Sequence, residues 1–259
     1  MTAPWLVRFA PRNDASIRLF AFSYAGAGAA TYRPWLFTLP HSIDLCAVQL
    51  PGRESRLAEP PLLSLHAMID GMLPAMRPYF DRPFAFFGHS MGALLAFELA
   101  RTLHQRGESQ LAHLLLSGRR APHLPDPEAP MRQLDDDAFV AEIRRRYGGI
   151  PAEVLQHRDL MQMLLPGLRA DMTAIETHEF RPSPPLSCPL TVFCGDIDHR
   201  ALPEQLAQWQ AYSKHPLQVR MFRGGHFYFS DASVRAELLN ELAHLLEPLA
   251  AQRSGSAWR

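Results

Sequence analysis

A serine, an aspartate and a histidine each stand in a glycine-containing segment directly after a strand-like run. Ser90 lies within Gly-His-Ser-Met-Gly, Asp198 ends Gly-Asp-Ile-Asp, and His226 follows two glycines. In this chain order the three residue types form a nucleophile, an acid that orients the base, and a general base. Such a set transfers acyl groups, because the histidine takes the serine proton as the hydroxyl attacks a carbonyl carbon. The pattern therefore predicts a serine hydrolase.

The segment around Ser90 predicts a nucleophile elbow. An unbroken apolar run, 83–87, precedes the motif, and helix-favouring residues follow it as far as Gly107. At such a junction the serine backbone is strained and lifts the hydroxyl above the sheet, while Gly88 and Gly92 let strand and helix approach closely. The alternative is a glycine-rich loop that only links a strand to a helix. The flanking strand and helix favour the elbow.

The base and the acid each have alternatives. His226 is preferred as the base because it follows the last expected strand. His89 and His199 are the other candidates, and adjacency to the serine directs the His89 side chain elsewhere. Asp198 is preferred as the acid because it stands third after a glycine, whereas Asp196 would shape the loop through hydrogen bonds to the backbone.

The oxyanion of a tetrahedral intermediate requires two backbone N–H donors. One is expected from Met91, the residue after the nucleophile, at the N-terminus of a helix. The other is expected from the small-residue loop 24–28, Tyr-Ala-Gly-Ala-Gly, whose backbone can approach a substrate carbonyl closely. This loop lacks the Gly-Lys-Ser/Thr ending of a phosphate-binding loop.

Bulk composition excludes several classes of partner. The 259-residue chain has 26 basic and 26 acidic residues, and this balance argues against attraction of the whole chain to nucleic acid or an anionic membrane. No apolar run approaches membrane-spanning length, and no secretory leader is recognisable. The 3 cysteines form no C-x-x-C pair and the 12 histidines are scattered. We therefore expect a reduced, cytoplasmic protein without structural zinc, another bound metal or a cofactor.

Strand-like and helix-like segments alternate along most of the chain, which is typical of a mostly parallel sheet with helices on both faces. The expected strands are 17–22, 43–50, 83–87, 111–116, 190–194 and 217–222, and the expected helices include 65–76 with an interruption at Pro74, 203–212 and 232–249. In such sheets functional groups gather at the carboxyl ends of the strands. Together with the elbow, this pattern predicts an α/β-hydrolase fold whose core comprises residues 1–121 and 186–259.

Residues 122–185, which we call the lid segment, interrupt the alternation. They contain three expected helices, 134–147, 152–168 and 170–179, between proline-rich edges. This succession without a strand predicts a helical lid; the alternative is that the helices only cover the sheet. A lid would gate a substrate channel, and its candidate lining residues are Leu155, Leu160, Met161, Met163, Leu164 and Leu165. The polar tail 252–259 is expected to fray.

Several segments together resemble the stand-alone type II thioesterases of nonribosomal peptide and polyketide synthesis. They are Phe-Ser-Tyr-Ala-Gly-Ala-Gly (22–28), Gln-Leu-Pro-Gly-Arg-Glu-Ser-Arg (49–56), Phe-Gly-His-Ser-Met-Gly-Ala (87–93), Ser-Gly-Arg-Arg-Ala-Pro (117–122), Leu-Pro-Gly-Leu-Arg-Ala-Asp (165–171), Gly-Asp-Ile-Asp (195–198) and Gly-Gly-His-Phe (224–227). The resemblance extends over nearly the whole chain. It departs from the family pattern where Ser23 replaces a proline and Ala27 replaces a glycine.

This resemblance implies Ser90 as nucleophile, Asp198 as orienting acid, His226 as base, and the backbone N–H groups of Ala25 and Met91 as oxyanion donors. It also implies the substrate, an acyl group in thioester linkage to the phosphopantetheine arm of an acyl or peptidyl carrier protein. The implied role is the removal of stalled or mis-primed acyl groups from an assembly line. We expect a monomer that binds neither nucleic acid nor membrane.

Two other functions fit part of the pattern. A small-molecule carboxylesterase or lipase uses the same three side chains, and a non-catalytic binding protein of this fold would be expected to lack one of them. The basic runs Arg144–Arg146 and Arg119–Arg120 are candidate docking surfaces for an acidic carrier protein. Their alternative interpretation is an ordinary solvated face.

Overall fold

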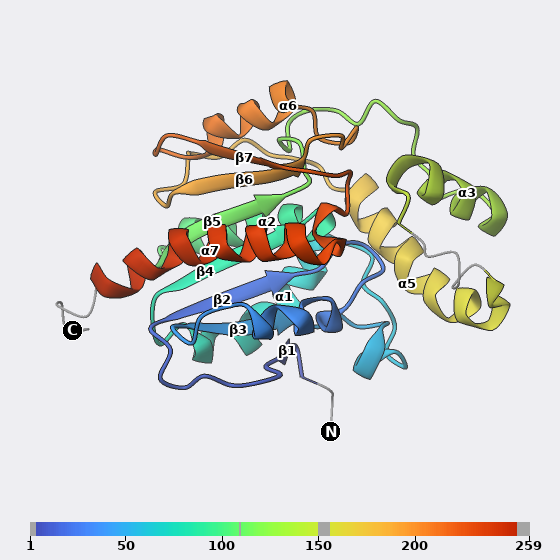
Figure 1. The fold of residues 1–259 in the computed structure, drawn as a ribbon. Helices are drawn as coiled ribbons and strands as arrows, with labels where there is room; N and C mark the ends of the chain where they lie inside the picture. The colour runs from blue at the N-terminus through green and yellow to red at the C-terminus, as the bar shows by residue number, and fades with distance from the viewer. Residues whose placement is uncertain (1–3, 109, 150–155, 253–259) are drawn as a thin grey trace.

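The computed structural model describes residues 4–108, 110–149 and 156–252. A seven-stranded sheet crosses the molecule in the order β1-β3-β2-β4-β5-β6-β7 (Figure 1). The short edge strand β1 is antiparallel to β3, and the other strands pair in parallel. The strands are β1 (Leu6–Val7), β2 (Ile17–Phe22), β3 (Ile43–Val48), β4 (Phe84–His89), β5 (Leu111–Ser117), β6 (Leu190–Gly195) and β7 (Gln218–Phe222). The mostly parallel sheet predicted from the sequence is confirmed.

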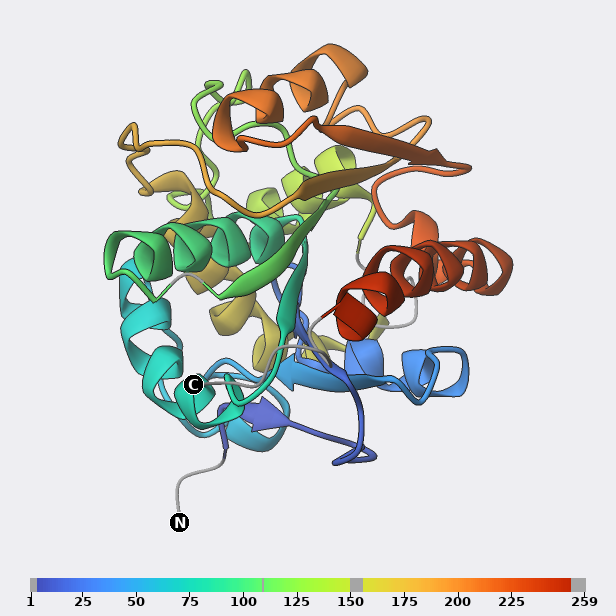
Figure 2. The same ribbon diagram turned by 90° about the vertical axis from the view of Figure 1, so that its left-hand side faces the viewer.

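Helices cover both faces of the sheet (Figure 2). On one face lie α1 (Leu65–Met76), α2 (Met91–Gln105) and α6 (Pro203–Ala207); on the other lie the 3-10 helix η1 (Ala29–Phe37) and α7 (Ala232–Gln252). Neighbouring residues of one strand serve opposite faces: Phe86 packs in the first apolar cluster and Phe87 in the second. This double burial explains why the central strands are continuous apolar runs rather than alternating ones.

The parallel register brings the carboxyl ends of the strands to one edge of the sheet, which we call the carboxyl edge. Phe22 pairs with Gly88, His89 with Ser117, and Gly195 with Phe222. The loops that follow these strands therefore begin side by side. They contain the four features that the sequence analysis singled out, namely loop 24–28, Ser90, Asp198 and His226.

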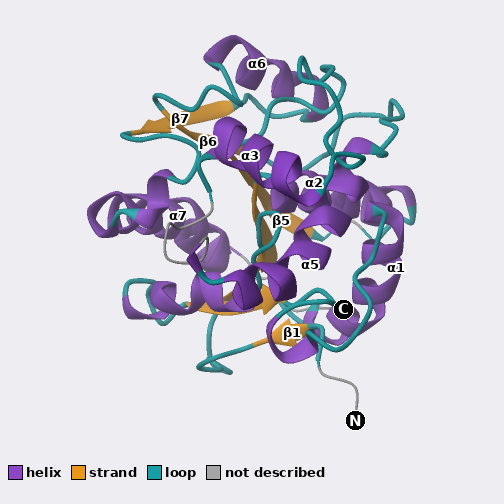
Figure 3. Ribbon diagram, turned by 90° about the vertical axis from the view of Figure 1, so that its right-hand side faces the viewer, coloured by secondary structure: helices purple, strands orange, loops and turns teal. Residues whose placement is uncertain are grey.

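Two helices of the lid segment, α3 (Asp136–Tyr147) and α5 (Arg158–Glu176), lie beyond the carboxyl edge (Figures 1 and 3). Asp135 caps α3 by accepting a hydrogen bond from the N–H of Ala138, and Gly148 ends it in the left-handed conformation. The two helices share an apolar cluster of their own. The division of the chain into a core and a lid segment stays a prediction.

The structure differs from the expectations at several helices. The expected helices 152–168 and 170–179 belong to one helix, α5, which has no break at Arg169 and ends at Glu176; residues 152–155 lie outside the described residues. Pro74 does not interrupt α1, because it stands near the helix C-terminus and removes a single hydrogen bond. The expected helix 203–212 changes to a 3-10 helix at Gln208. The predicted fraying of the tail concerns residues beyond 252, which the structure does not describe.

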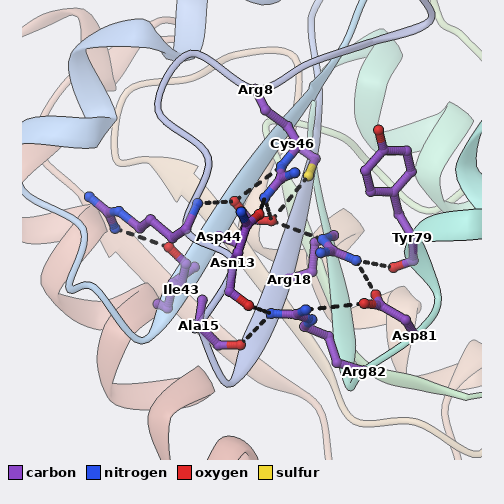
Figure 4. A network of polar contacts seen from close by, with 11 residues as sticks. Arg8, Asn13, Ala15, Arg18, Ile43, Asp44, Cys46, Tyr79, Asp81 and Arg82 are labelled. Carbon is purple, nitrogen blue, oxygen red and sulfur yellow. Dashed lines mark hydrogen bonds and ion pairs between the residues drawn. The ribbon is translucent and has the colours of Figure 1, made fainter.

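At the opposite edge, where β2 and β3 begin, buried charges form what we call the amino-edge network (Figure 4). Asp44 accepts hydrogen bonds from Arg18 Nε at 2.9 Å and from the Arg12 backbone N–H at 3.1 Å, and Arg8 Nη2 lies 2.8 Å from its carboxylate. Burial alone would raise the pKa of Asp44, but these donors hold the pKa below its usual value. The network ties the starts of two strands together.

Candidate active site

The turn between β4 and α2 has the geometry of the predicted elbow. Ser90 has a φ of 55°, in the left-handed region, and its N–H donates to the Ser117 carbonyl at 2.8 Å. A Cβ at Gly88 would lie 2.1 Å from the Gly92 carbonyl oxygen, and one at Gly92 would lie 2.0 Å from the Phe22 carbonyl oxygen. Neither position has room for a side chain. The two glycines thus allow the close packing of β2, β4 and α2 on which the strained serine depends.

His226 and Asp198 come together from the loops after β7 and β6. His226 Nδ1 lies 2.8 Å from Asp198 Oδ2, and both side chains are buried. The carboxylate also accepts the Arg200 backbone N–H at 2.9 Å. Burial alone would raise the pKa of Asp198, but the hydrogen bonds from His226 and Arg200 hold the pKa below its usual value. An ionised carboxylate at Nδ1 leaves Nε2 of a neutral imidazole free to accept a proton.

Ser90 and His226 line the same cavity, which has a volume of about 380 Å³. His226 Nε2 is buried and makes no hydrogen bond to any described residue, Ser90 included. In serine hydrolases the bond between nucleophile and base often tightens only when substrate is bound. The structure therefore places both groups at one cavity with the bond between them not formed.

The alternative acid, Asp196, and the alternative bases, His89 and His199, make other contacts. Asp196 is exposed and accepts the Gly224 N–H at 2.8 Å, so it shapes the loop as expected. His199 is exposed. His89 is fully buried and packs beside His226, with 4.9 Å between the ring centroids.

His89 belongs to a chain of buried hydrogen bonds. Its Nδ1 bonds Ser117 Oγ at 2.9 Å, and that hydroxyl bonds Tyr228 Oη at 2.8 Å. Burial, and secondly the neighbouring His226, lower the pKa of His89 well below its usual range. His89 is therefore a neutral buried ring that packs against the ring of His226.

Two backbone N–H groups beside the cavity suit the predicted oxyanion donors. Met91 is the first residue of α2, so its N–H has no acceptor within the helix. Ala25 lines the cavity together with Ser90, and its N–H makes no hydrogen bond to another described residue. Ser23, which replaces a proline of the family pattern, donates its hydroxyl to the Gly28 carbonyl at 2.8 Å and closes the loop. The donor roles of Ala25 and Met91 stay predictions.

Helix α5 supplies much of the apolar wall of the cavity. Its lining residues are Met161, Leu164, Leu165, Leu168, Met172 and Ile175, joined by Ile143 and Tyr147 of α3. The expectation is confirmed for the first three. Leu160 and Met163 do not line the cavity and are 41% and 48% exposed. Leu155 lies outside the described residues.

Two features beside the cavity were missed in the sequence analysis. Arg53 donates Nη1 and Nη2 to the two oxygens of Asp171 at 2.6 and 2.7 Å, with both side chains buried. Glu54 has a φ of 46°, so among the described residues it shares a positive φ with Ser90 and with glycines. The signals were present in the segments 49–56 and 165–171, to which no chemistry had been assigned.

The arginines of the two candidate docking runs differ in their exposure and in their pairing with carboxylates. Arg120 is 6% exposed and pairs with Asp126, and the Arg146 side chain pairs with Glu142. Burial lowers the pKa of Arg119 to about 10. Arg144 is exposed. Arg145 is 53% exposed and pairs with Glu128 and Glu142, so the accessible charge of these runs lies on Arg144 and Arg145.

Three further properties concern metal-binding groups, the length and polarity of the helices, and the cysteines. Among residues 4–108, 110–149 and 156–252, no group of three or more His, Cys, Asp or Glu side chains is arranged to hold a metal ion. Within the same ranges, every helix is too short or too polar to cross a bilayer. Cys46, Cys188 and Cys194 are buried free thiols.

Comparison with known proteins decides the family. A sequence profile of the thioesterase domain matches residues 17–246. The chain belongs to the thioesterase family. This thioesterase is 38% identical over 228 residues to the gramicidin S biosynthesis protein GrsT of Aneurinibacillus migulanus, which covers 88% of this chain and 89% of the relative. It is 40% identical over 244 residues to the thioesterase PikA5 of Streptomyces venezuelae, covering 93% and 85%.

Solved structures agree with the family assignment. RedJ, the thioesterase from the prodiginine biosynthetic pathway in Streptomyces coelicolor, superposes with a TM-score of 0.84 at 36% identity, covering 95% of this chain and 91% of RedJ. The predicted α/β-hydrolase fold and the resemblance to type II thioesterases are thereby confirmed. The protein is a thioester hydrolase.

Proposed function

We propose that this thioesterase removes acyl groups from the phosphopantetheine arm of acyl or peptidyl carrier proteins, and so restores a free thiol to stalled assembly lines. The observation that carries the proposal is the apolar cavity of about 380 Å³ that contains both Ser90 and His226 under α5. Such a cavity suits an acyl chain held next to the nucleophile. The names of GrsT and RedJ, which place those relatives in gramicidin S and prodiginine biosynthesis, support the same substrate class.

The reaction proposed is acyl transfer in two steps. Ser90 Oγ attacks the thioester carbon while His226 Nε2 takes the hydroxyl proton, and Asp198 stabilises the resulting imidazolium. The oxyanion accepts hydrogen bonds from the N–H groups of Ala25 and Met91, each worth about 3 kcal/mol in comparable enzymes. The carbon–sulfur bond then breaks, and the imidazolium proton passes to the departing thiolate. Water, activated by His226, hydrolyses the acyl-serine.

This route requires no cofactor or metal, because the side chains and backbone donors supply nucleophile, base and electrostatic stabilisation. We propose further that the enzyme acts as a monomer in the cytoplasm with carrier proteins as its partners. The equal numbers of acidic and basic residues support a partner other than nucleic acid or an anionic membrane.

The test uses carrier proteins loaded with different acyl and aminoacyl groups. Mass spectrometry after incubation with the enzyme should show loss of the acyl mass and recovery of the free phosphopantetheine arm, whereas Ser90→Ala should leave the acyl group in place. The alternative function as a small-molecule carboxylesterase is tested with an oxygen ester of the same acyl group. A higher kcat/KM for that ester than for the acyl carrier would contradict the proposal.

A further inference from the structure

The proposed oxyanion loop is held by a carboxylate from the lid segment. The N–H of Gly26 donates to Asp171 Oδ2 at 2.7 Å, across 145 positions of the chain. Asp171 lies on α5, and its side chain is 0% exposed. Because the peptide plane that contains this N–H begins at the carbonyl of Ala25, the bond fixes the backbone directly after the proposed donor.

Arg53 completes the arrangement. Its guanidinium forms two parallel bonds to Asp171, and Nη1 also donates to the Ala27 carbonyl at 3.2 Å. The Ala27 N–H in turn donates to the Tyr24 carbonyl at 3.1 Å, which closes a turn around Ala25. The planar guanidinium fork admits one orientation of the carboxylate. Both members of the ion pair therefore contact the turn that presents the Ala25 N–H.

The segment 49–56 holds the pair from the side of the core. The Gln49 side chain donates to the Arg53 carbonyl at 3.0 Å and accepts the Ala29 N–H at 2.9 Å. Glu54, in its left-handed conformation, accepts the Ala30 N–H at 3.2 Å. These contacts join the start of η1 to the backbone of Arg53. Arg53 is thus held by segment 49–56 and the start of η1, while Asp171 lies on α5 of the lid segment.

The same stretch of α5 forms the wall of the cavity. Leu168, one turn before Asp171, lines the cavity and packs on the oxyanion loop, where a Cβ at Gly26 would lie 3.1 Å from Leu168 Cδ1. Gly26 has a φ of 79°, so a larger residue would also be strained there. Any displacement of α5 by a bound acyl group would therefore move the carboxylate that holds the loop.

We propose that Arg53 and Asp171 are positioning residues that aim the Ala25 N–H at the developing oxyanion and make this aim depend on the docking of α5. The proposal rests on the proposed acyl transfer at Ser90. In that reaction neither side chain touches the reacting atoms, and both act through the backbone of Ala25. An acyl group that lets α5 dock closely is hydrolysed quickly, and one that displaces α5 loses oxyanion stabilisation.

The first test compares Asp171→Asn with Asp44→Asn, a buried aspartate of the amino-edge network. With the small substrate butyryl-N-acetylcysteamine, Asp171→Asn should lower kcat by about 10- to 100-fold while KM changes by less than about threefold. The inhibition constant of an alkyl trifluoromethyl ketone, which forms a tetrahedral adduct with the serine, should rise by the same factor as kcat/KM falls. Asp44→Asn should lower Tm and leave kcat and this constant unchanged. An unchanged inhibition constant in Asp171→Asn would overturn the proposal.

The second test exchanges the pair, Arg53→Asp with Asp171→Arg. The ion pair is restored, but the N–H of Gly26 then meets a donor instead of an acceptor, so Tm should recover and kcat should not. Recovery of kcat would show that the pair only fastens α5 to the core. If the exchanged protein does not fold, Arg53→Lys takes its place, because an ammonium cannot bond both carboxylate oxygens and the Ala27 carbonyl in the fork geometry. Lower kcat at unchanged KM supports the proposal, and unchanged kcat contradicts it. All rates use the small thioester, so inactivity toward acyl carriers would refute the proposed function alone.

Discussion

Two buried arginine–aspartate pairs stand at opposite edges of the same sheet. At the amino edge, Arg18 and Asp44 have side chains that are 3% and 0% exposed; at the carboxyl edge, Arg53 and Asp171 are 4% and 0% exposed. The first pair joins residues of adjacent strands, where backbone hydrogen bonds already fix the register. The second joins a loop to a helix of the lid segment, where no strand pairing holds either partner. The two pairs are therefore equally buried, but the local backbone geometry depends more on the pair at the carboxyl edge than on the pair at the amino edge.

This difference indicates what each edge requires of its charges. A buried ion pair loses so much hydration that it seldom adds much net stability, although removal of one partner is strongly destabilising. At the amino edge, removal of one partner would lower the free energy of unfolding. At the carboxyl edge the pair also determines the orientation of N–H groups at the cavity, so removal of one partner would lower kcat as well. Substitutions that separate stability from turnover can test this contrast.

The largest expected effect is at the elbow. Ser90→Ala removes the nucleophile, and hydrolysis of a thioester should fall by about 10⁴-fold or more. Tm should stay close to that of the wild type, because the substitution deletes one hydroxyl and changes no backbone contact. Steady-state rates and thermal unfolding of the two proteins provide the measurement. Near-wild-type turnover in the variant would refute the mechanism.

The next effect concerns the two acidic residues of the loop after β6. Asp198→Asn replaces the acceptor at His226 Nδ1 with an amide that favours the wrong tautomer, and kcat should fall by about 10³- to 10⁴-fold. Asp196→Asn is the matched control, since the Asp196 side chain accepts only the Gly224 N–H among the described residues, and kcat of this variant should change by less than about threefold. Comparable losses of kcat in both variants would mean that kcat depends on the conformation of the loop rather than on the contact between Asp198 and His226.

An intermediate effect, on stability alone, is expected at the amino edge. Asp44→Asn removes the buried carboxylate that Arg8 and Arg18 share, although Arg18 keeps its pair with Asp81, and should reduce the free energy of unfolding by about 3 kcal/mol. The pKa of Asp44 is lower in the folded than in the unfolded chain, so its ionisation stabilises the fold at neutral pH, and this contribution disappears as the pH falls below about 4.

The variant should accordingly show a shallower loss of stability between neutral and acid pH than the wild type. Chemical denaturation at a series of pH values measures this slope, and kcat measured alongside should not change. A large fall in kcat at unchanged stability would reverse the assignment of roles to the two edges.

The sequence predicted those parts of the molecule whose signals are local. Strand β2 was predicted with its observed ends, because a strand buried on both faces is a continuous apolar run with sharp limits. Ser90, Asp198 and His226 could be singled out because each combines a reactive side chain with neighbouring glycines at the end of such a run. The two-residue strand β1 and the 3-10 helix η1 lack any periodic pattern and were missed.

The sequence could not predict features that depend on distant segments. Arg53 and Asp171 are 118 positions apart, and nothing in the local pattern of either segment indicates that they pair. The continuity of α5 between 168 and 170, where two helices were expected to meet, has a similar origin, because the apolar side of the whole helix packs in the lid cluster. The motifs at 49–56 and 165–171 drew attention to Arg53 and Asp171, but only the fold showed that these two side chains contact each other.

The smallest expected effect tests where the influence of the carboxyl edge ends. Tyr228→Phe removes the hydroxyl that bonds Ser117 Oγ, while Ser117 keeps its bond to His89. Stability should fall by about 1 kcal/mol, the usual net value of one buried hydrogen bond, and kcat should change by less than about threefold. Thermal unfolding and steady-state rates from pH 6 to 9 measure both quantities. A tenfold fall in kcat would show that Tyr228 helps to orient His226. A fall in stability alone would show that Tyr228, like the amino-edge pair, serves the stability of the fold and not turnover.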